Sequence, residues 1–338
     1  MTSHDDSKPP RGGDSPWNTA RPRVGQARPD KRERERLRAA AGGDAAPRSD
    51  APRRDTAYRG PRDEPRSWSA GSSRAGASAA MPPPPRPETQ QRQEELRLFG
   101  INACKAAFAS RPQDLRKAYL TEERIPEFKT LLAWLVQQRL GYRVVEPADL
   151  AKLTASQHHE GICLEMRRRA PLSLDELLAQ LPPAPQPALL VLLDGVGNPH
   201  NFGAVLRSAA NFGIAGIVLP QDSSLTLSGA ACRVAEGGAE IVPLARAPAQ
   251  AELLAQLRAA GFAIAATVPR AGVSLYQNPL PARLALVFGA ENEGMSAPLI
   301  DAADLRLTIP GTGKVESLNI AASAAVLFAD YFRHHGGA

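Results

Sequence analysis

The carboxyl-terminal part of the chain alternates short, continuous apolar runs with longer amphipathic segments. Continuous apolar runs predict buried strands, and apolar positions spaced three or four residues apart predict helices. Buried strands that alternate with helices indicate an α/β fold, in which a mainly parallel sheet carries helices on both faces. The predicted strands lie at 188–194, 213–220, 240–245, 262–268, 284–289 and 305–310, and the clearest helices at 201–213 and 249–261.

Residues 93–168 show a less regular pattern, which predicts a separate small α/β domain. The expected order is a helix and then a strand within 94–121, followed by helix (126–141), strand (142–146), helix (147–154) and strand (161–167). Residues 169–187 contain a short amphipathic helix and end in a proline-rich stretch. We therefore expect a linker there, followed by a second domain over 188–338.

Residues 1–92 show neither pattern, and their composition is that of a basic tail. Residues 1–90 hold 14 of the 31 prolines, and their 18 Lys and Arg against 12 Asp and Glu account for the whole net charge of +6. So few aliphatic residues cannot bury enough apolar surface to fold, so we expect disorder. Trp17, Tyr58 and Trp68 lie among arginines, which favours contact with single-stranded nucleic acid. A tail that only keeps the protein in solution is the alternative interpretation.

Cysteine usage and the amino terminus indicate a cytoplasmic protein. Cys104, Cys163 and Cys232 are far apart and not in CxxC spacing, which favours a reducing compartment with no disulfide framework and no zinc site. The first residues lack the apolar core of a secretory signal, and no apolar run approaches the roughly 18 residues of a membrane span. We therefore expect no membrane segment and no bound metal.

The stretch "IPGTGKVESLNIA" (309–321) looks at first like a phosphate-binding loop. The pattern GxxxxGK[ST] fails at both ends, because Thr308 stands where it needs glycine and Val315 where it needs a hydroxyl side chain. The loop after the first strand carries Gly195 and Gly197, but His200 stands where a dinucleotide fingerprint needs its third glycine. Neither a phosphate loop nor a nicotinamide site is predicted.

Ligands of parallel sheets bind beyond the carboxyl ends of the strands, so the loops there form the candidate site. Arg207 and Glu291 stand among small apolar residues in these regions, where a charge is costly unless it faces a cleft or a partner. Turn and cap chemistry alone explains several of the other polar residues. The loops follow Leu193, Val268, Val287 and Ile309, and the polar residues are Asn198, Asn201, Arg207, Glu291, Ser317 and Asn319.

Three of these segments together resemble the motifs of the SpoU/TrmH family, the RNA ribose 2′-O-methyltransferases of the SPOUT superfamily. They are "NPHNFGAVLRSAANFG" (198–213), "LVFGAENEGMS" (286–296) and "LTIPGTGKVESLNIAASAAVLF" (307–328). Residues 93–168 are similar to the family's small RNA substrate-binding domain, which has the fold of ribosomal protein L30e. That second similarity is carried mostly by "GINA" and "HHEG".

The resemblance implies features that the hydrophobic pattern does not contain. The carboxyl-terminal segment would form a trefoil knot, and the protein would be a homodimer with its active site at the subunit interface. S-adenosylmethionine would be the methyl donor, with no metal, and tRNA or rRNA the substrate. By position, the cofactor contacts would be Gly289, Ile309 and Leu318, with Thr267 as a weaker candidate.

Arg207 matches the catalytic arginine of the family. Methyl transfer is an in-line displacement, so the ribose oxygen must lie about 3 Å from the sulfonium methyl. Because arginine is nearly always protonated, we expect Arg207 to fix the 2′-hydroxyl and stabilise the developing oxyanion. A role as base would need a large lowering of its pKa. The resemblance implies that Asn201, Glu291, Ser317 and Asn319 position these groups, and Asn319 suits a helix cap equally well.

Two residues in "RVAEGGAE" depart from the family pattern, and they bear on target choice. Glu236 and Gly238 stand where the family more often has small residues and alanine. Two other functions stay open: an RNA-binding factor without turnover, and a methyltransferase for a protein or a small molecule. Intact Arg207, Glu291 and Asn319 favour an enzyme over the first, and the basic tail and small domain favour RNA over the second.

Overall fold

The computed structural model describes residues 95–277, 279–290 and 294–336. The disordered tail predicted over 1–92 and the predicted site residue Glu291 lie outside the described residues. All described residues belong to one compact unit.

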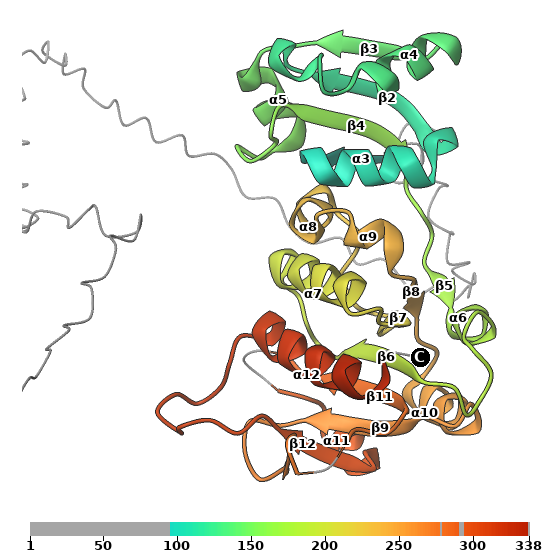
Figure 1. The fold of residues 1–338 in the computed structure, drawn as a ribbon, viewed down its shortest axis with the longest axis vertical. Coiled ribbons are helices and arrows are strands. Elements are labelled where there is room, and N and C mark those ends of the chain that lie inside the picture. Colours follow the sequence, from blue (N-terminus) through green and yellow to red (C-terminus); the bar gives the residue numbers. More distant parts are fainter. Residues whose placement is uncertain (1–94, 278, 291–293, 337–338) are drawn as a thin grey trace, which may run out of the picture. The chain divides into compact units, whose positions relative to one another are not determined.

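The predicted parallel sheet is confirmed, and it has eight strands in the order β10-β12-β9-β11-β6-β7-β8-β5 (Figure 1). Every neighbouring pair in it is parallel. The central strands β6 and β11 are buried along their whole length, as their continuous apolar sequences predict. The strands are β5 Leu172–Ser173, β6 Ala188–Leu193, β7 Gly216–Leu219, β8 Leu244–Arg246, β9 Ala263–Thr267, β10 Val273–Ser274, β11 Arg283–Phe288 and β12 Leu305–Thr308.

Helices cover both faces of this sheet, because alternate residues of each central strand face opposite sides. In β6, Val191 belongs to the cluster formed with α7 and α12, whereas Leu190 belongs to the cluster formed with α6, α10 and α11. Phe288 of β11 meets Phe328 of α12 edge to face, with ring centroids 6.5 Å apart. The helices are α6 Leu174–Ala179, α7 Pro199–Asn211, α8 Gly229–Ala235, α9 Gly238–Ile241, α10 Gln250–Ala259, α11 Ala297–Ala302 and α12 Ile320–His335.

The strand predicted at 240–245 is partly wrong, because the short helix α9 occupies its first two positions. An apolar run does not by itself distinguish a strand from a helical segment. Here tertiary contacts decide: Gly238 packs against α7, where an added Cβ would lie 2.8 Å from the Leu206 carbonyl oxygen. The strand begins only at Leu244, where β8 joins the sheet beside β7.

The small domain has a four-stranded sheet in the order β1-β4-β2-β3, flanked by three α-helices. The helix predicted first in this domain is wrong at its start, since residues 95–99 form β1, in which Leu96 and Leu98 alternate with exposed residues. This alternation is the period of a strand, and helix α3 begins only after Gly100. The elements are β1 Glu95–Phe99, α3 Ile101–Ser110, β2 Leu115–Leu120, α4 Lys129–Gln137, β3 Gly141–Val144, α5 Pro147–Thr154 and β4 Ile162–Arg167.

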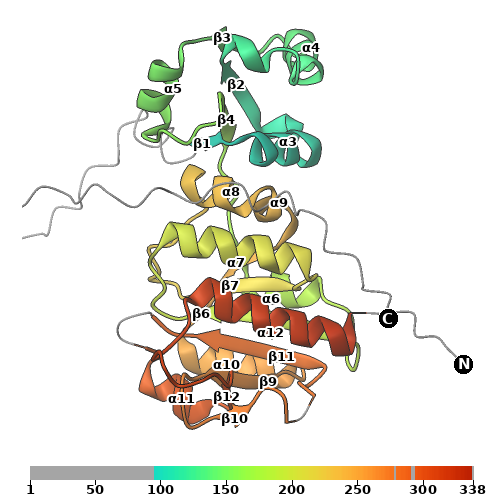
Figure 2. The ribbon, with the colours of Figure 1, turned by 60° about the vertical axis from the view of Figure 1, so that its left-hand side comes forward.

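Helices α8 and α9 lie between the small domain and α7, and they join the two domains (Figure 2). Arg111, just after α3, donates from Nε and Nη2 to the two carboxylate oxygens of Glu240 in α9, at 2.8 and 2.9 Å. Both side chains are buried. Burial acts to lower the pKa of Arg111, but the hydrogen bonds and charge of Glu240, helped by Asp114, raise it overall. This pair fixes α9 against the small domain.

The segment predicted as a linker also contributes to the large sheet. Its strand β5 pairs with β8, and Leu177 of α6 packs against Gly216 of β7 so closely that an added Cβ would lie 2.8 Å from a Leu177 methyl carbon. Ser173 and Glu176 form a reciprocal capping box at the start of α6. The middle of the segment 169–187, which comprises β5 and α6, is therefore packed against the large sheet.

The three cysteines are buried and are not joined in disulfides. Burial raises the pKa of Cys163 and of Cys232 to about 12, and it raises the pKa of Cys104 well above its usual value. Within the described ranges, no helix has the length and apolar character needed to cross a membrane. The same ranges contain no group of three or more His, Cys, Asp or Glu side chains placed to hold a metal ion.

Candidate active site at the carboxyl edge of the large sheet

The loops selected from the sequence meet at one edge of the large sheet, because parallel strands end on the same side. Asp194, directly after β6, donates its backbone N–H to the carbonyl oxygen of Phe288 at the end of β11, at 2.8 Å. Its carboxylate accepts from the backbone N–H of Ser296 at 2.9 Å. The loop after β6 is therefore attached at two points to the loop after β11.

The loop after β11 turns back tightly on itself at Gly289. A Cβ added at this position would lie 2.3 Å from the Met295 backbone nitrogen, so only glycine fits without moving the loop. Ala290 and Gly294 exchange both backbone hydrogen bonds, at 2.8 and 2.9 Å, and close the turn. Glu291 belongs to the part of this turn outside the described residues.

The first and third sequence motifs are joined by two asparagines. Nδ2 of Asn319 donates to Oδ1 of Asn201 at 3.2 Å. Oδ1 of Asn319 accepts from the backbone N–H of Ala321 at 2.9 Å, so this residue also caps α12. At the start of α7, Asn198 accepts from the backbone N–H of His200 at 2.9 Å. The cap expected as an alternative role for Asn319 therefore exists together with its contact to Asn201.

Arg207 lies in the middle of α7 and points away from the apolar core. Its side chain is 65% exposed, and Nη1 lies 4.0 Å from Oε1 of Glu236. The neighbouring residues Phe202, Val205 and Leu206 are buried. Arg207 therefore lies on the side of α7 that faces away from the sheet.

The turn after β12 carries three of the predicted residues. Ile309 is half-buried and packs against the main core, whereas residues 310–319 are all exposed, Ser317 and Leu318 among them. Leu318 is 48% exposed and Val315 68%, so two apolar side chains of this turn face outward. Lys314 is exposed in the same turn, in keeping with a solvated charge.

The hydroxyl groups of Thr267 and Thr308 form hydrogen bonds with neighbouring strands and loops of the large sheet. The hydroxyl of Thr267 donates to the carbonyl oxygen of Val287 at 2.8 Å and ties β9 to β11. The hydroxyl of Thr308 accepts from the backbone N–H of Gly272 at 3.0 Å and lies 3.1 Å from the Val268 carbonyl oxygen. Thr308 thereby holds the loop that follows β9 beside the end of β12.

Asp194 and Thr308 also shape the site, although neither was predicted from the sequence. An Asp that follows a buried strand, and a Thr at the end of one, are weak signals that ordinary turns also produce. Glu236 was noted only as a departure from the family pattern. Its position beside Arg207 depends on how α8 and α9 pack on α7, which no local pattern contains.

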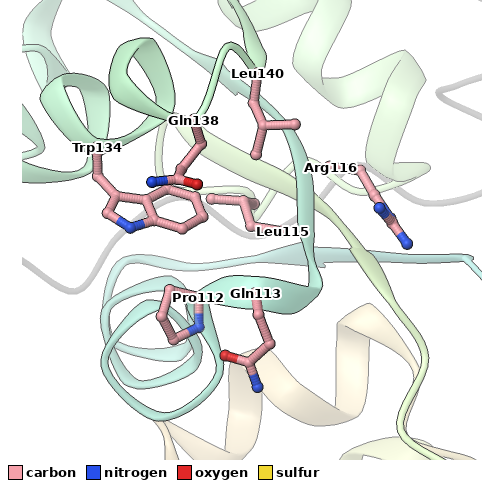
Figure 3. Close-up of a pocket in the computed structure, with 7 residues that line it drawn as sticks. All are labelled: Pro112, Gln113, Leu115, Arg116, Trp134, Gln138 and Leu140. Carbon is pink, nitrogen blue, oxygen red and sulfur yellow. The ribbon is translucent and has the colours of Figure 1, made fainter.

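A surface pocket of about 420 Å³ lies elsewhere, on the small domain (Figure 3). Trp134 and Gln138, at the end of α4, lie opposite Pro112 and Gln113, and Leu115 lies between them. Arg116 is also part of its wall. None of these residues belongs to the loops at the edge of the large sheet, so this pocket is distinct from the candidate active site.

Two domain families match the chain, one on each side of the linker. Residues 188–329 match the SpoU rRNA Methylase family, and residues 97–172 match the family described as RNA 2′-O ribose methyltransferase substrate binding. These two matches correspond to the large and the small domain of the structure.

Similar proteins support the same assignment. A protein of Escherichia coli O157:H7, named uncharacterized tRNA/rRNA methyltransferase YfiF, is 38% identical over 246 residues, which cover 73% of this chain and 70% of that protein. The 23S rRNA (guanosine-2′-O-)-methyltransferase RlmB of Nitrosomonas europaea is 33% identical over 240 residues, which cover 70% of this chain and 91% of that protein.

The fold is also that of solved structures. A crystal structure described as an RNA 2′-O ribose methyltransferase has a TM-score of 0.61 and 26% identity, over 73% of this chain and 92% of that chain. The SpoU methyltransferase AviRb from Streptomyces viridochromogenes, at 21% identity and a TM-score of 0.60 over 75% of this chain and 95% of that chain, shares the fold. On these matches, the chain belongs to the SpoU rRNA methylase family.

Proposed function

We propose that this protein transfers a methyl group from S-adenosylmethionine to a ribose 2′-hydroxyl of tRNA or rRNA. The observation that carries the proposal is the bond between Asn201 and Asn319, which places the third motif beside the helix that presents Arg207. The relatives named as 23S rRNA (guanosine-2′-O-)-methyltransferases support the reaction class. Their matches cover 70% and 68% of this chain.

The residues at the sheet edge fit S-adenosylmethionine, whose adenosine and amino acid parts need backbone groups and apolar walls. A Cβ at Gly289 would clash with Met295 and Gly294, so glycine allows the close turn whose backbone groups would contact the cofactor. Ile309 and Leu318 supply apolar surface on either side of the exposed turn. Gly289, Ile309 and Leu318 would therefore hold the cofactor, and Thr267 would support it through its bond between strands. The bound cofactor supplies an electrophilic methyl group on its sulfonium.

Arg207 is the proposed catalytic residue. Its exposed guanidinium offers several N–H donors to the ribose 2′-oxygen and to an adjacent phosphate, and it stabilises the negative charge that develops on the oxygen. Asn201 and Asn319 hold α7 and the start of α12 in register, so that the arginine faces the methyl donor. Ser317 in the exposed turn and Glu291 complete the proposed set of polar side chains.

A homodimer with the active site at its interface is part of the proposal, as is a trefoil knot in the carboxyl-terminal segment. Two exposed apolar side chains close together in the chain, Val315 and Leu318 in the turn after β12, support the dimer, since neighbouring exposed apolar groups often mark an interaction site. A second subunit would cover these side chains and enclose the turn.

The small domain and the tail are the proposed RNA-binding parts. In the domain, the indole of Trp134 and the exposed guanidinium of Arg116 border one pocket, which suits an unpaired base and its phosphate. In the tail, the excess of arginines favours contact with the phosphate backbone. We further propose that catalysis resides in 188–338, RNA recognition in 93–168, and the site of action in the cytoplasm.

Mapping ribose methylation across cellular RNA, with and without this protein, tests the proposal. The expected result is the loss of one or a few 2′-O-methyl groups from tRNA or rRNA when the protein is absent. An unchanged map, together with no heat of binding when S-adenosylmethionine is titrated into the protein, would instead favour an RNA-binding factor without turnover.

A further inference from the structure

Residues 236–238 form a tight turn between α8 and α9 that touches both domains at once. An added Cβ at Gly237 would lie 2.9 Å from Cβ of Ala106 in α3, and one at Gly238 would lie 3.2 Å from Cα of Arg207 in α7. The two glycines thus let the turn pass between the small domain and the middle of α7. The residue that precedes them, Glu236, is placed directly beside Arg207.

The carboxylate of Glu236 connects a side chain of the small domain to Arg207. Nδ2 of Asn102 in α3 donates to Oε2 of Glu236 at 2.7 Å. The other oxygen, Oε1, lies 4.0 Å from Nη1 of Arg207. Glu236 is 27% exposed and Arg207 65%, so the carboxylate is the better fixed of the two.

Backbone conformation shows that glutamate is not the residue the turn itself requires. Glu236 has φ 51° and ψ 39°, in the left-handed region that favours glycine and, after it, asparagine. An exposed ion pair at 4.0 Å adds little to folding stability. Neither the backbone conformation nor folding stability therefore explains a glutamate at position 236. Its contacts with Asn102 and Arg207 do.

We propose that Glu236 is a positioning residue, which is held by Asn102 and orients the guanidinium of Arg207 toward the ribose hydroxyl. This inference rests on the proposed function, since it assigns Glu236 a role through Arg207. It also links the small, RNA-binding domain to the catalytic arginine by a chain of two contacts. The position of that domain then contributes to the orientation of Arg207.

Glu236→Gly in the full chain separates this role from a structural one. Glycine relieves the left-handed backbone, so the Tm should stay the same or rise. Without the carboxylate, kcat for methyl transfer should fall by about tenfold, while KM for RNA changes little, because the loss lies in the alignment of the transition state. Glu236→Gln still accepts the hydrogen bond from Asn102 but lacks the charge, so its kcat should lie between those of the wild type and Glu236→Gly.

Asn102→Ala should also lower kcat. The double variant of Asn102→Ala and Glu236→Gly should have the same kcat as Glu236→Gly alone, because the two residues act as one unit. Ala155→Gly is the matched control, since Ala155 also has a left-handed backbone (φ 52°) but lies at the end of α5. It should raise the Tm and leave kcat unchanged. A Glu236→Gly enzyme with the kcat of the wild type, or fully additive losses, would overturn the proposal.

A readout that does not need turnover keeps the two proposals apart. Relaxation of the Arg207 Nε–H group, assigned with Arg207→Lys, measures how firmly the guanidinium is held. Its order parameter should drop in Glu236→Gly and stay at the wild-type value in Ala155→Gly. An unchanged order parameter contradicts the role of Glu236, whereas a wild-type chain that methylates no RNA contradicts the proposed function alone.

Discussion

Asn319 donates its side-chain amide to the side-chain carbonyl of Asn201 at 3.2 Å, across 118 positions of the sequence. The same Asn319 caps α12 through its carbonyl oxygen. One side chain thus starts the last helix and attaches it to the first turn of α7. Because Arg207 lies on α7, this contact relates the turn after β12 to the proposed catalytic arginine.

Substitutions of Asn319 should distinguish the effect of its cap on α12 from the effect of its hydrogen bond to Asn201. Aspartate caps helices as well as asparagine does, but an ionised carboxylate cannot donate to Asn201. Asn319→Asp should therefore keep the stability of the wild type and lose methyl transfer activity, whereas Asn319→Ala should lose both, with about 1 kcal/mol of stability lost with the cap. Urea unfolding and a methyl transfer assay check this. Equal activity of wild type and Asn319→Asp would show that only the cap matters.

Gly289→Ala should weaken the binding of S-adenosylmethionine. The added Cβ would lie 2.3 Å from the Met295 nitrogen, so the loop after β11 must move away from the position that fits the ligand. A loss of about 1.4 kcal/mol corresponds to a tenfold higher Kd by calorimetry. Gly141→Ala on the small domain is the control, because its nearest neighbours would lie 4.0 Å away. An unaltered Kd for Gly289→Ala would remove this loop from the cofactor site.

The pair Arg111–Glu240 should contribute strongly to stability. Both side chains are buried, and Glu240→Ala leaves the charge of Arg111 with only Asp114 at 3.4 Å, so the loss should approach that of a broken buried pair, about 3–5 kcal/mol. In the double variant, adding Arg111→Ala to Glu240→Ala should lower the free energy of unfolding by less than Arg111→Ala does alone, because the buried positive charge has then been removed. The exposed pair Arg306–Asp301 at 3.5 Å is the comparison, and Asp301→Ala should cost less than about 1 kcal/mol. Urea unfolding that shows equal losses for the two pairs would contradict this view of the interface.

Alkaline pH should lower the free energy of unfolding through the buried thiols. The pKa of Cys163 is about 12 in the folded chain, against about 8.5 for an unfolded cysteine. Between about pH 9 and 11 the unfolded chain binds fewer protons, so stability falls by about 1.4 kcal/mol per pH unit for this thiol. Urea unfolding of wild type and Cys163→Ala should therefore give a shallower pH slope for the variant. Parallel slopes would contradict the raised pKa.

Much of the large domain was predictable from the sequence, because its strands are buried on both faces. Five of the six predicted strands match observed ones, and the sixth shares only its last residues with β8. The first strand of the small domain was missed, since Leu96 and Leu98 alternate over only five residues beside a helical pattern. Short segments at domain borders are decided by tertiary contacts, which local periodicity does not record.

The candidate site was predictable only in part. The motifs led to Asn201, Arg207 and Asn319, and the structure places two of them in contact. The partner of Arg207 was not predictable, because Glu236 reaches it through the packing of α8 on α7. The exposed turn with Ser317 and Leu318 stays a predicted part of the site.

Arg207 is expected to promote methyl transfer to an RNA ribose. The direct measurement is transfer of labelled methyl groups from S-adenosylmethionine to total tRNA and rRNA by wild type and Arg207→Ala. The side chain is exposed, so the variant should fold normally and bind S-adenosylmethionine. Its rate should fall by about 10²–10³, the usual cost of removing one donor to an oxyanion. An Arg207→Ala protein that transfers methyl groups at the wild-type rate would contradict the account.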